Sequence, residues 1–207
     1  PGQVRDSNSY ALAAAVKEVE AIPLQFGIIP DSKESLRQTL QEAYEKSDVL
    51  LTLGGVSVGD YDYVQEILLE LGFEKRFWKV AIKPGKPVLF GRWGEKIVFG
   101  LPGNPGSALT VFEQLVRPAL KKMMGHSQLF YPTVKAKLLD SISYKGDRLH
   151  LLRANLSLSK TGTYEIKPLK NQGSGNILIA SQTNAVIPVA RPLEAGEFVT
   201  VQVLESY

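Results

Sequence analysis

The spacing of apolar residues predicts helices and strands that alternate from residue 8 to about residue 124. Leu12 and Val16 share one stripe of a first helix, and Leu36 and Leu40 share one stripe of a second. The other elements expected are helices at 63–71 and 105–124 and strands at 22–29, 48–53, 77–82, 87–90 and 96–101. Such alternation is typical of a mostly parallel sheet covered by helices, so we expect a three-layer α/β/α domain. Strand 48–53 is expected to be buried on both faces.

The pattern changes near Pro132 to short runs in which every second residue is apolar. These runs predict strands at 133–139, 149–158, 164–168, 185–189 and 197–204, separated by Gly, Asn, Ser and Pro. We therefore expect an α/β domain over residues 1–128, followed by a small all-β, barrel-like domain over 129–207.

Composition narrows the class of protein. With 207 residues and 44% hydrophobic residues, the chain can build a core. A net charge of +3 is too small to indicate a nucleic-acid surface, and the lack of cysteine excludes disulfides and thiolate catalysis. No apolar run approaches the ~20 residues that span a bilayer, so we expect no membrane segment and a cytoplasmic protein. Because the chain opens on Pro1 and no strand precedes the first helical pattern, we expect a piece of a longer polypeptide.

A glycine pair, Gly54 and Gly55, directly follows strand 48–53. At the carboxyl end of a parallel strand, such a turn can aim backbone N–H groups at an anion. Asp60 and Asp62 follow closely, and carboxylates beside a phosphate suit Mg²⁺. Each feature alone could be a tight turn and a helix cap, but together they favour an anion pocket with a metal site.

Three lysines, Lys79, Lys83 and Lys86, surround the rigid turn Pro84-Gly85. Alternation along strand 77–82 would put Lys79 and Lys83 on the same side, and proline fixes the path of the chain. Lysine is a compact cation that suits oxyanions such as phosphate or molybdate. A solvated hairpin rim is the alternative interpretation.

A second strand-to-helix turn consists of Pro102, Gly103, Asn104 and Pro105, with Asn104 as the expected cap and Ser107 in the first helical turn. It brings another helix N-terminus to the same edge of the sheet, and the two turns together predict one cleft.

The β domain could contribute to this cleft. Arg153 could reach an anion at the domain junction, although an exposed arginine is the simpler interpretation. Polar turns at 172–176 and 181–184 could also face the cleft. We assign no role to His126 or His150.

Four motifs in order point to a known family: Gly-Gly-Val-Ser-Val-Gly-Asp-Tyr-Asp at 54–62, Phe-Trp-Lys-Val-Ala-Ile-Lys-Pro-Gly-Lys-Pro at 77–87, Phe-Gly-Leu-Pro-Gly-Asn-Pro at 99–105 and Gln-Gly-Ser-Gly at 172–175. In these motifs the chain resembles the C-terminal half of the molybdopterin molybdenumtransferases, the MoeA and gephyrin E-domain family. The resemblance implies a MoaB/MogA-like molybdopterin-binding domain and then a small β-barrel-like domain. It also implies an activity: insertion of molybdate into adenylylated molybdopterin, with release of AMP and with a divalent cation.

By position in the family motifs, Asp31 and Asp62 are the implied acidic functional residues. Lys79, Lys83 and Lys86 are the implied oxyanion-binding ones.

The remaining roles implied by the resemblance concern the substrates. Pro102 and Pro105 would shape the pterin site, Ser57 and Ser107 would donate hydrogen bonds, and Arg153 would reach molybdate.

The resemblance also implies partners: a homodimer in the full-length protein and contact with molybdopterin adenylyltransferase. Family members open this domain with a strand that ends in a Thr-Gly-Asp-Glu type turn, and they carry two further N-terminal domains. That strand has no counterpart in this sequence, so we expect exposed apolar surface or a compensating partner.

Two other functions are open at this stage. One is a non-catalytic scaffold, because the family includes a receptor-clustering protein. The other is a molybdopterin adenylyltransferase; those proteins carry Gly-Gly-Thr-Gly where this chain has Gly-Gly-Val-Ser, which ranks this hypothesis lower.

Overall fold

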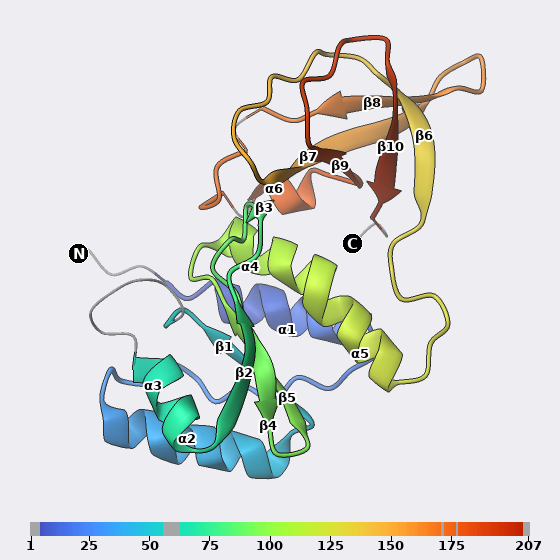
Figure 1. The fold of residues 1–207 in the computed structure, drawn as a ribbon. Coiled ribbons are helices and arrows are strands. Elements are labelled where there is room, and N and C mark those ends of the chain that lie inside the picture. The colour runs from blue at the N-terminus through green and yellow to red at the C-terminus, as the bar shows by residue number, and fades with distance from the viewer. Residues whose placement is uncertain (1–4, 56–62, 171, 177, 205–207) are drawn as a thin grey trace.

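A computed structural model describes residues 5–55, 63–170, 172–176 and 178–204. These residues form a layered α/β domain and a β-barrel, which lie one above the other in Figure 1. The elements of the α/β domain are α1 (Asn8–Glu18), α2 (Lys33–Lys46), β1 (Val49–Leu53), α3 (Tyr63–Glu70), β2 (Phe73–Trp78), β3 (Ile82–Lys83), β4 (Leu89–Trp93), β5 (Lys96–Leu101), α4 (Pro105–Val111), the π-helical turn η1 (Phe112–Val116) and α5 (Arg117–Met123). The elements after them are β6 (Thr133–Leu138), β7 (Leu149–Leu158), β8 (Tyr164–Pro168), α6 (Leu178–Ser181), β9 (Ala185–Val189) and β10 (Phe198–Val203).

The sheet of the first domain has the strand order β1-β5-β4-β2. Strands β1 and β5 are parallel, whereas β4 is antiparallel to both β5 and β2. The described strands therefore form a mixed sheet, not the mostly parallel one that the alternating pattern predicted. The reason is local: only Gly94 and Glu95 separate β4 from β5, and a connection of that length allows a hairpin but no crossover.

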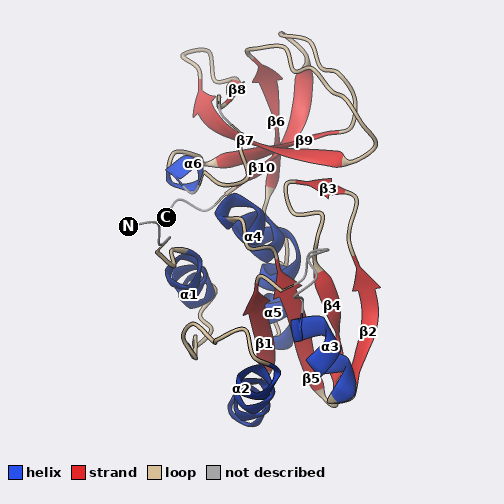
Figure 2. Ribbon diagram, turned by 90° about the vertical axis from the view of Figure 1, so that its left-hand side faces the viewer, coloured by secondary structure: helices blue, strands red, loops and turns tan. Residues whose placement is uncertain are grey.

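Helices cover both faces of this sheet, which confirms the three-layer α/β/α prediction (Figure 2). On one face, α1 and the α4–η1–α5 helix pack against β5 in a core that includes Val16, Phe99 and Phe112. On the other face, α2 and α3 pack against β1, β4 and β5 around Leu50 and Ile67. Because adjacent residues of a strand point to opposite faces, β5 contributes to both cores.

Three strand predictions in this domain are wrong. The strand expected at 77–82 lies earlier in the chain, because β2 covers Phe73–Trp78. Strand β5 is buried on both faces, whereas in β1 only Leu50 is buried, because β1 lies at the edge of the described sheet. Residues 22–29 form no strand, since a strand needs a hydrogen-bonded neighbour and this segment has none among the described residues. Its apolar side chains Ile22 and Ile28 are exposed.

The second domain is a closed barrel in which the strands follow the order β7-β8-β6-β10-β9 and β9 pairs again with β7. The short strand β3, which comes from the α/β domain, adds to the outside of β7 in parallel. Strands β7, β8 and β9 have the bounds that period-two alternation predicts. None of the helices described here is both long and apolar enough to cross a membrane.

Candidate functional site

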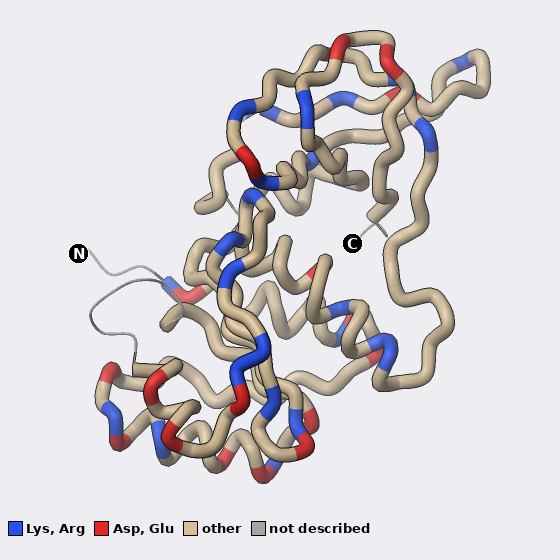
Figure 3. Tube along the Cα trace, viewed as in Figure 1, with Lys and Arg blue, Asp and Glu red and all other residues tan. Residues whose placement is uncertain are grey.

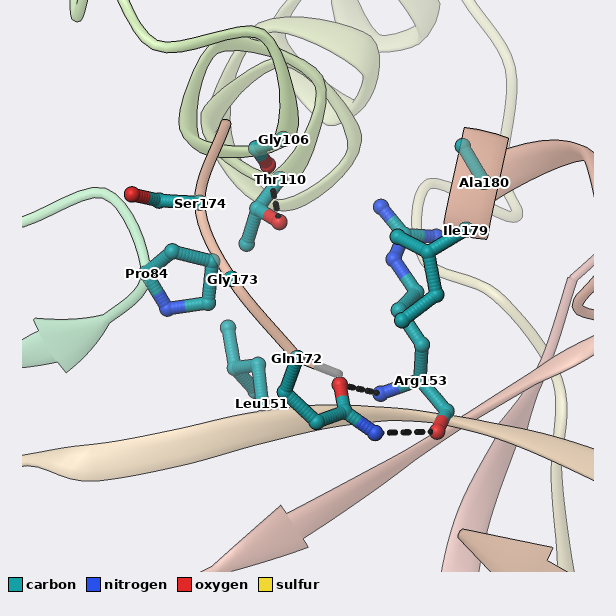
Figure 4. Close-up of a pocket in the computed structure, with 10 residues that line it drawn as sticks. All are labelled: Pro84, Gly106, Thr110, Leu151, Arg153, Gln172, Gly173, Ser174, Ile179 and Ala180. Atoms are coloured by element: carbon teal, nitrogen blue, oxygen red, sulfur yellow. Dashed lines mark hydrogen bonds between the residues drawn. The ribbon is translucent and has the colours of Figure 1, made fainter. Parts of the chain in front are cut away.

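A small hollow lies where the α/β domain meets the barrel (Figure 4). Its walls come from the turn after β3, from α4, from β7, and from α6 and the segment before it. The polar lining residues are Thr110, Arg153, Gln172 and Ser174, and the others are Pro84, Gly106, Leu151, Gly173, Ile179 and Ala180. The hollow therefore combines the predicted Lys-Pro-Gly turn, the predicted helix start and the predicted polar turn of the barrel.

The Lys-Pro-Gly turn is held from both sides. Through β3 it pairs with β7 of the barrel, and the Leu149 N–H also donates to the Ala81 carbonyl oxygen over 2.8 Å. On the other side Gly85 contacts α4, where a Cβ atom would lie 2.7 Å from Cγ2 of Val111. Gly85 also has a φ of +103°, so glycine is required both by backbone conformation and by space.

Helix α4 begins against the barrel segment that precedes α6. The Gly106 N–H donates to the Ser174 carbonyl oxygen over 2.8 Å, and Asn104 Nδ2 donates to Ser174 Oγ over 3.2 Å. Asn104 takes the N-cap position as predicted, but its side chain makes no capping hydrogen bond because it points to Ser174 instead. A Cβ atom on Gly106 would lie 3.0 Å from the Ser174 carbonyl oxygen, which explains the glycine at this close approach.

Arg153 crosses the junction from β7 and is buried, which excludes the simpler interpretation of an exposed arginine. Its Nη2 donates to Glu113 Oε2 of η1 over 2.6 Å, and the two side chains are only 7% and 1% exposed. Nη1 of Arg153 is also buried and has no hydrogen-bond partner among the described residues. A buried cationic donor without an acceptor is costly, so an acceptor that entered the hollow would be stabilised there.

Gln172 fixes the backbone beneath Arg153 (Figure 4). The Arg153 N–H donates to Gln172 Oε1 over 3.1 Å, and Gln172 Nε2 donates to the carbonyl oxygens of Arg153 and Leu169, each over 2.8 Å. The backbone of Arg153 is thus held by a neighbouring side chain, and the far end of its own side chain is held by the other domain.

A second group of predicted residues meets at the carboxyl edge of β1 and β5. Gly54 has a φ of +76°, and its N–H donates to the Leu101 carbonyl oxygen over 3.0 Å. A Cβ atom on Gly103 would lie 3.9 Å from the Cα of Gly54, so the two predicted glycine turns are neighbours. Asn8 at the start of α1 joins them, since its Nδ2 donates to the Gly103 carbonyl oxygen over 2.7 Å.

Two buried oxygens at this edge lack a partner: Asn8 Oδ1 and Thr52 Oγ1 make no hydrogen bond within the described part of the chain. Gly55 also has a positive φ, +67°, a conformation that favours glycine. Because glycine has no side chain, the backbone is uncovered where it leaves the sheet. We name Asn8, Thr52, Gly54, Gly55 and Gly103 the glycine edge.

The three predicted lysines are exposed but do not share one strand. Strand β2 ends at Trp78, and Lys79 turns the chain with a φ of +77° while its Nζ lies 3.6 Å from the centre of the Trp78 ring. The alternation that would align Lys79 with Lys83 is therefore interrupted, and that prediction is wrong. Basic residues nevertheless recur along the path from β2 to the barrel (Figure 3), where Lys75, Arg76, Lys79, Lys83 and Lys86 are all exposed.

Ser107 is buried in the first turn of α4, directly after the lining residue Gly106, and its carbonyl oxygen would lie 3.6 Å from a Cβ atom on Gly85. The remaining predicted residues lie apart from the hollow or outside the described residues. Asp31 is exposed directly before α2, which lies at the end of the domain away from the barrel, so Asp31 is not brought to the hollow (Figures 1 and 2). Ser57, Asp60 and Asp62 are outside the described residues.

The predicted metal site depends on Asp60 and Asp62. Within the described ranges, no group of three or more His, Asp or Glu side chains is placed to hold a metal ion. The residues that the structure describes do not by themselves fit Mg²⁺.

His150 lies beside the lysine turn, since it is the register partner of Lys83 in the β3–β7 pair. Burial lowers the pKa of His150, and the positive charges of Lys83 and Arg148 lower it further. Its ring lies 4.9 Å from the ring of Tyr144. The imidazole is therefore biased towards its neutral form.

Sequence reasoning missed Glu113, Thr110 and Asn8. Glu113 lies in an otherwise apolar part of a helix, which was a usable signal for a buried charge. A regular helical period could not place it, because the π-helical turn changes which side chains face the barrel.

Comparisons with known proteins identify the family. Residues 1–122 match the family model described as "Probable molybdopterin binding domain", and residues 135–204 match the one described as "MoeA C-terminal region (domain IV)". Among curated proteins, the chain is 38% identical to a molybdopterin molybdenumtransferase of Nostoc sp. strain PCC 7120 over 97% of this chain and 48% of that protein. It is 32% identical to the protein of the same name from Haemophilus influenzae, over 97% of this chain and 50% of the relative.

Among solved structures, a molybdopterin biosynthesis MoeA protein from Pyrococcus horikoshii superposes with a TM-score of 0.80 at 29% identity, over 100% of this chain and 50% of that one. A molybdenum cofactor biosynthesis protein from Pyrococcus furiosus gives a TM-score of 0.76 at 27% identity, over 96% and 64% of the two chains. The chain spans about half the length of the curated relatives that it matches. It belongs to the family of probable molybdopterin binding domains, and the C-terminal region of MoeA follows that domain.

Proposed function

We propose that this chain forms the substrate-binding part of a molybdopterin molybdenumtransferase, on which molybdate is inserted into adenylylated molybdopterin and AMP is released. The relatives with that name support the proposal, as does the presence of the motifs throughout the chain. The observation that carries it is the buried Arg153, whose unpartnered Nη1 belongs to a residue that lines the hollow between the two domains. Neither the scaffold nor the adenylyltransferase hypothesis gains a supporting observation.

Molybdate is assigned to the junction hollow. A tetrahedral oxyanion offers acceptor oxygens, and Arg153 Nη1 lacks one. Ser174 supplies a hydroxyl group to the lining, whereas the Thr110 hydroxyl already donates to the Gly106 carbonyl oxygen over 2.8 Å. The exposed Lys83 and Lys86 flank the Pro84 wall. A fixed guanidinium with nearby hydroxyl and ammonium groups is a chemically suitable receptor for a dianion.

The pterin nucleotide is assigned to the glycine edge, with Gly54, Gly55, Ser57 and the turn from Pro102 to Pro105 as its contacts. Glycines there let the backbone approach a ligand closely, and the buried oxygens of Asn8 and Thr52 can accept hydrogen bonds from it. The turn at 102–106 links this edge to the junction hollow, because Gly103 adjoins Gly54 and Gly106 adjoins Ser174. Pterin and oxyanion could therefore be held on opposite sides of one turn.

Charge is the main obstacle to the reaction, because a nucleotide, a dithiolene and molybdate are all anionic. Lys79, Lys83, Lys86 and Arg153 would offset the repulsion and stabilise the phosphate that leaves as AMP. Mg²⁺ held by Asp60 and Asp62 would supply further positive charge when bound. Asp31 would act as an acidic residue only if the ligand extends to the start of α2.

The cytoplasmic location, the homodimer of the full-length protein and the contact with molybdopterin adenylyltransferase also stay proposals. Their support is the family resemblance.

Calorimetric titration of adenylylated molybdopterin into the chain tests the proposal. We expect binding that weakens at least about tenfold in Lys83→Ala, because one ammonium group beside a phosphate contributes on the order of 1.4 kcal/mol. Lys137→Ala, at an exposed position of β6, is the matched control and should bind like the wild type. Equal affinity of Lys83→Ala and the wild type would contradict the site.

A further inference from the structure

Among the described residues, Glu113 is the acidic side chain that forms an ion pair with Arg153. It lies in η1 of the α/β domain, and its Oε2 is 2.6 Å from Nη2 of an arginine in the barrel. Both side chains are almost wholly excluded from solvent, so water screens their charges weakly. The charge that the hollow offers to a ligand is therefore that of a pair rather than that of a lone guanidinium.

The π-helical turn brings this carboxylate to the junction. Glu113 is followed by Gln114, and Gln114 exchanges hydrogen bonds of 2.9 and 3.1 Å with Gln202 of β10. Two consecutive side chains of η1 thus both reach the barrel, which the wider π-helical turn makes possible. One of them touches Arg153 and the other does not, so the effect of charge can be separated from the effect of domain docking.

The guanidinium divides its hydrogen bonds between protein and hollow. Nη2 donates to Glu113, while Nη1 has no acceptor in the part of the chain that the structure describes. The carboxylate thereby keeps the planar fork in one orientation, with Nη1 left over for a ligand. The same carboxylate repels any anion that binds Nη1, because the two acceptors would lie on the same guanidinium group.

We propose that Glu113 is a specificity-determining residue that limits how tightly the junction hollow holds a tetrahedral dianion. It positions Arg153 and at the same time offsets its charge, so that the oxyanion is recognised by geometry but can still be passed to the pterin. This inference rests on the proposed function, because it takes the oxyanion at Arg153 as given.

Glu113→Gln separates the two effects. Glutamine has the same shape and keeps an acceptor oxygen for Nη2, so the arginine stays in position. Only the negative charge is lost, and the uncompensated guanidinium should attract anions more strongly. We expect molybdate to bind roughly tenfold more tightly to the variant, since partly buried charges a few ångströms apart interact by more than 1.4 kcal/mol, the equivalent of a tenfold change. A variant that merely damaged the structure would bind molybdate more weakly.

The test is calorimetric titration of the whole chain with molybdate and with perrhenate, a tetrahedral monoanion of similar shape. If charge is the cause, Glu113→Gln should gain less affinity for perrhenate than for molybdate. The gain should also vanish when Arg153 is replaced as well, in Arg153→Ala with and without Glu113→Gln. Gln114→Ala, which breaks the neighbouring contact with Gln202, should leave molybdate affinity unchanged.

Weaker or unchanged molybdate binding by Glu113→Gln overturns the inference, and so does an equal gain in Gln114→Ala. If wild-type protein does not bind molybdate at all, the proposed function fails as well, so the two failures are distinguishable. Should Glu113→Gln not fold, the wild type still decides: a lone arginine would favour molybdate over perrhenate by about tenfold or more, whereas the pair predicts nearly equal affinities for the two anions.

Discussion

The junction hollow and the glycine edge are built in opposite ways. The hollow depends on side chains far apart in the sequence, above all Glu113, Arg153 and Gln172, which fix one charged group through an ion pair and several hydrogen bonds. The glycine edge depends on short local motifs, in which Gly54 and Gly55 adopt positive φ angles and leave space open. The hollow holds a charged side chain in place, and the glycine edge lets a ligand approach the backbone closely. The proposed reaction, in which molybdate enters a bulky pterin nucleotide and AMP is released, would use both.

Removal of Arg153 should have the largest effect on stability, because it breaks the buried ion pair that distinguishes the hollow from the glycine edge. Arg153→Ala removes one member of a buried ion pair, which should lower the free energy of unfolding by about 3–5 kcal/mol. Urea denaturation followed by circular dichroism measures this loss.

Arg76→Ala is the matched control, since Arg76 pairs with Glu74 on the exposed face of β2 and such a pair contributes less than about 1 kcal/mol. Similar losses for the two variants would mean that the buried ion pair contributes no more to stability than the exposed one.

Glycine substitutions should separate the two sites next. Gly85→Ala places a methyl group 2.7 Å from Val111 Cγ2 and also strains a positive φ, so we expect a loss of about 2–4 kcal/mol. Gly54→Ala strains the backbone alone, because its Cβ would meet nothing within 4 Å, and should cost only about 1–2 kcal/mol. Denaturant midpoints of the two variants give the comparison, and a greater loss for Gly54→Ala would reverse the assignment of crowded and open turns.

A smaller effect is expected from the glycine edge. Asn8→Ala removes the 2.7 Å hydrogen bond to the Gly103 carbonyl oxygen, for a loss of about 1 kcal/mol in stability. If the pterin nucleotide binds at this edge, the same variant should weaken nucleotide binding and leave molybdate binding intact. Calorimetry with each ligand separately would reveal the opposite pattern if the two assignments were exchanged.

The smallest effect concerns pH. The folded protein lowers the pKa of His150, through burial and through Lys83 and Arg148, so the unfolded chain binds a proton more readily. Stability from this residue is fully present above the unfolded pKa of about 6.5 and is lost as the pH falls towards the folded value.

The melting temperature should therefore fall between pH 7 and pH 5 by more in the wild type than in His150→Gln. The same fall in both proteins would show that His150 does not contribute.

The sequence was sufficient for those parts of the molecule that local periodicity determines. Strands β7, β8 and β9 follow from patterns of a few residues. The strand expected at 22–29 did not form, because a strand needs a hydrogen-bonded partner strand. The local pattern of apolar residues does not reveal whether such a partner is present.

The site divides in the same way. The Lys-Pro-Gly turn and the helix start at Asn104 could be identified from motifs, because each is a local conformation. That Arg153 is buried, and that Glu113 meets it, follows from the packing of two domains and from a π-helical turn, neither of which a helical period predicts. The lysines show the limit most clearly, since one residue with a positive φ, Lys79, was enough to break the expected alternation.

Titration of molybdate into wild-type protein and into Arg153→Ala tests the central claim most directly. Wild-type protein should bind molybdate at one site per chain, and Arg153→Ala should show no saturable binding while its barrel remains folded by circular dichroism. Equal molybdate binding by the two proteins would show that the oxyanion does not lie at the junction hollow.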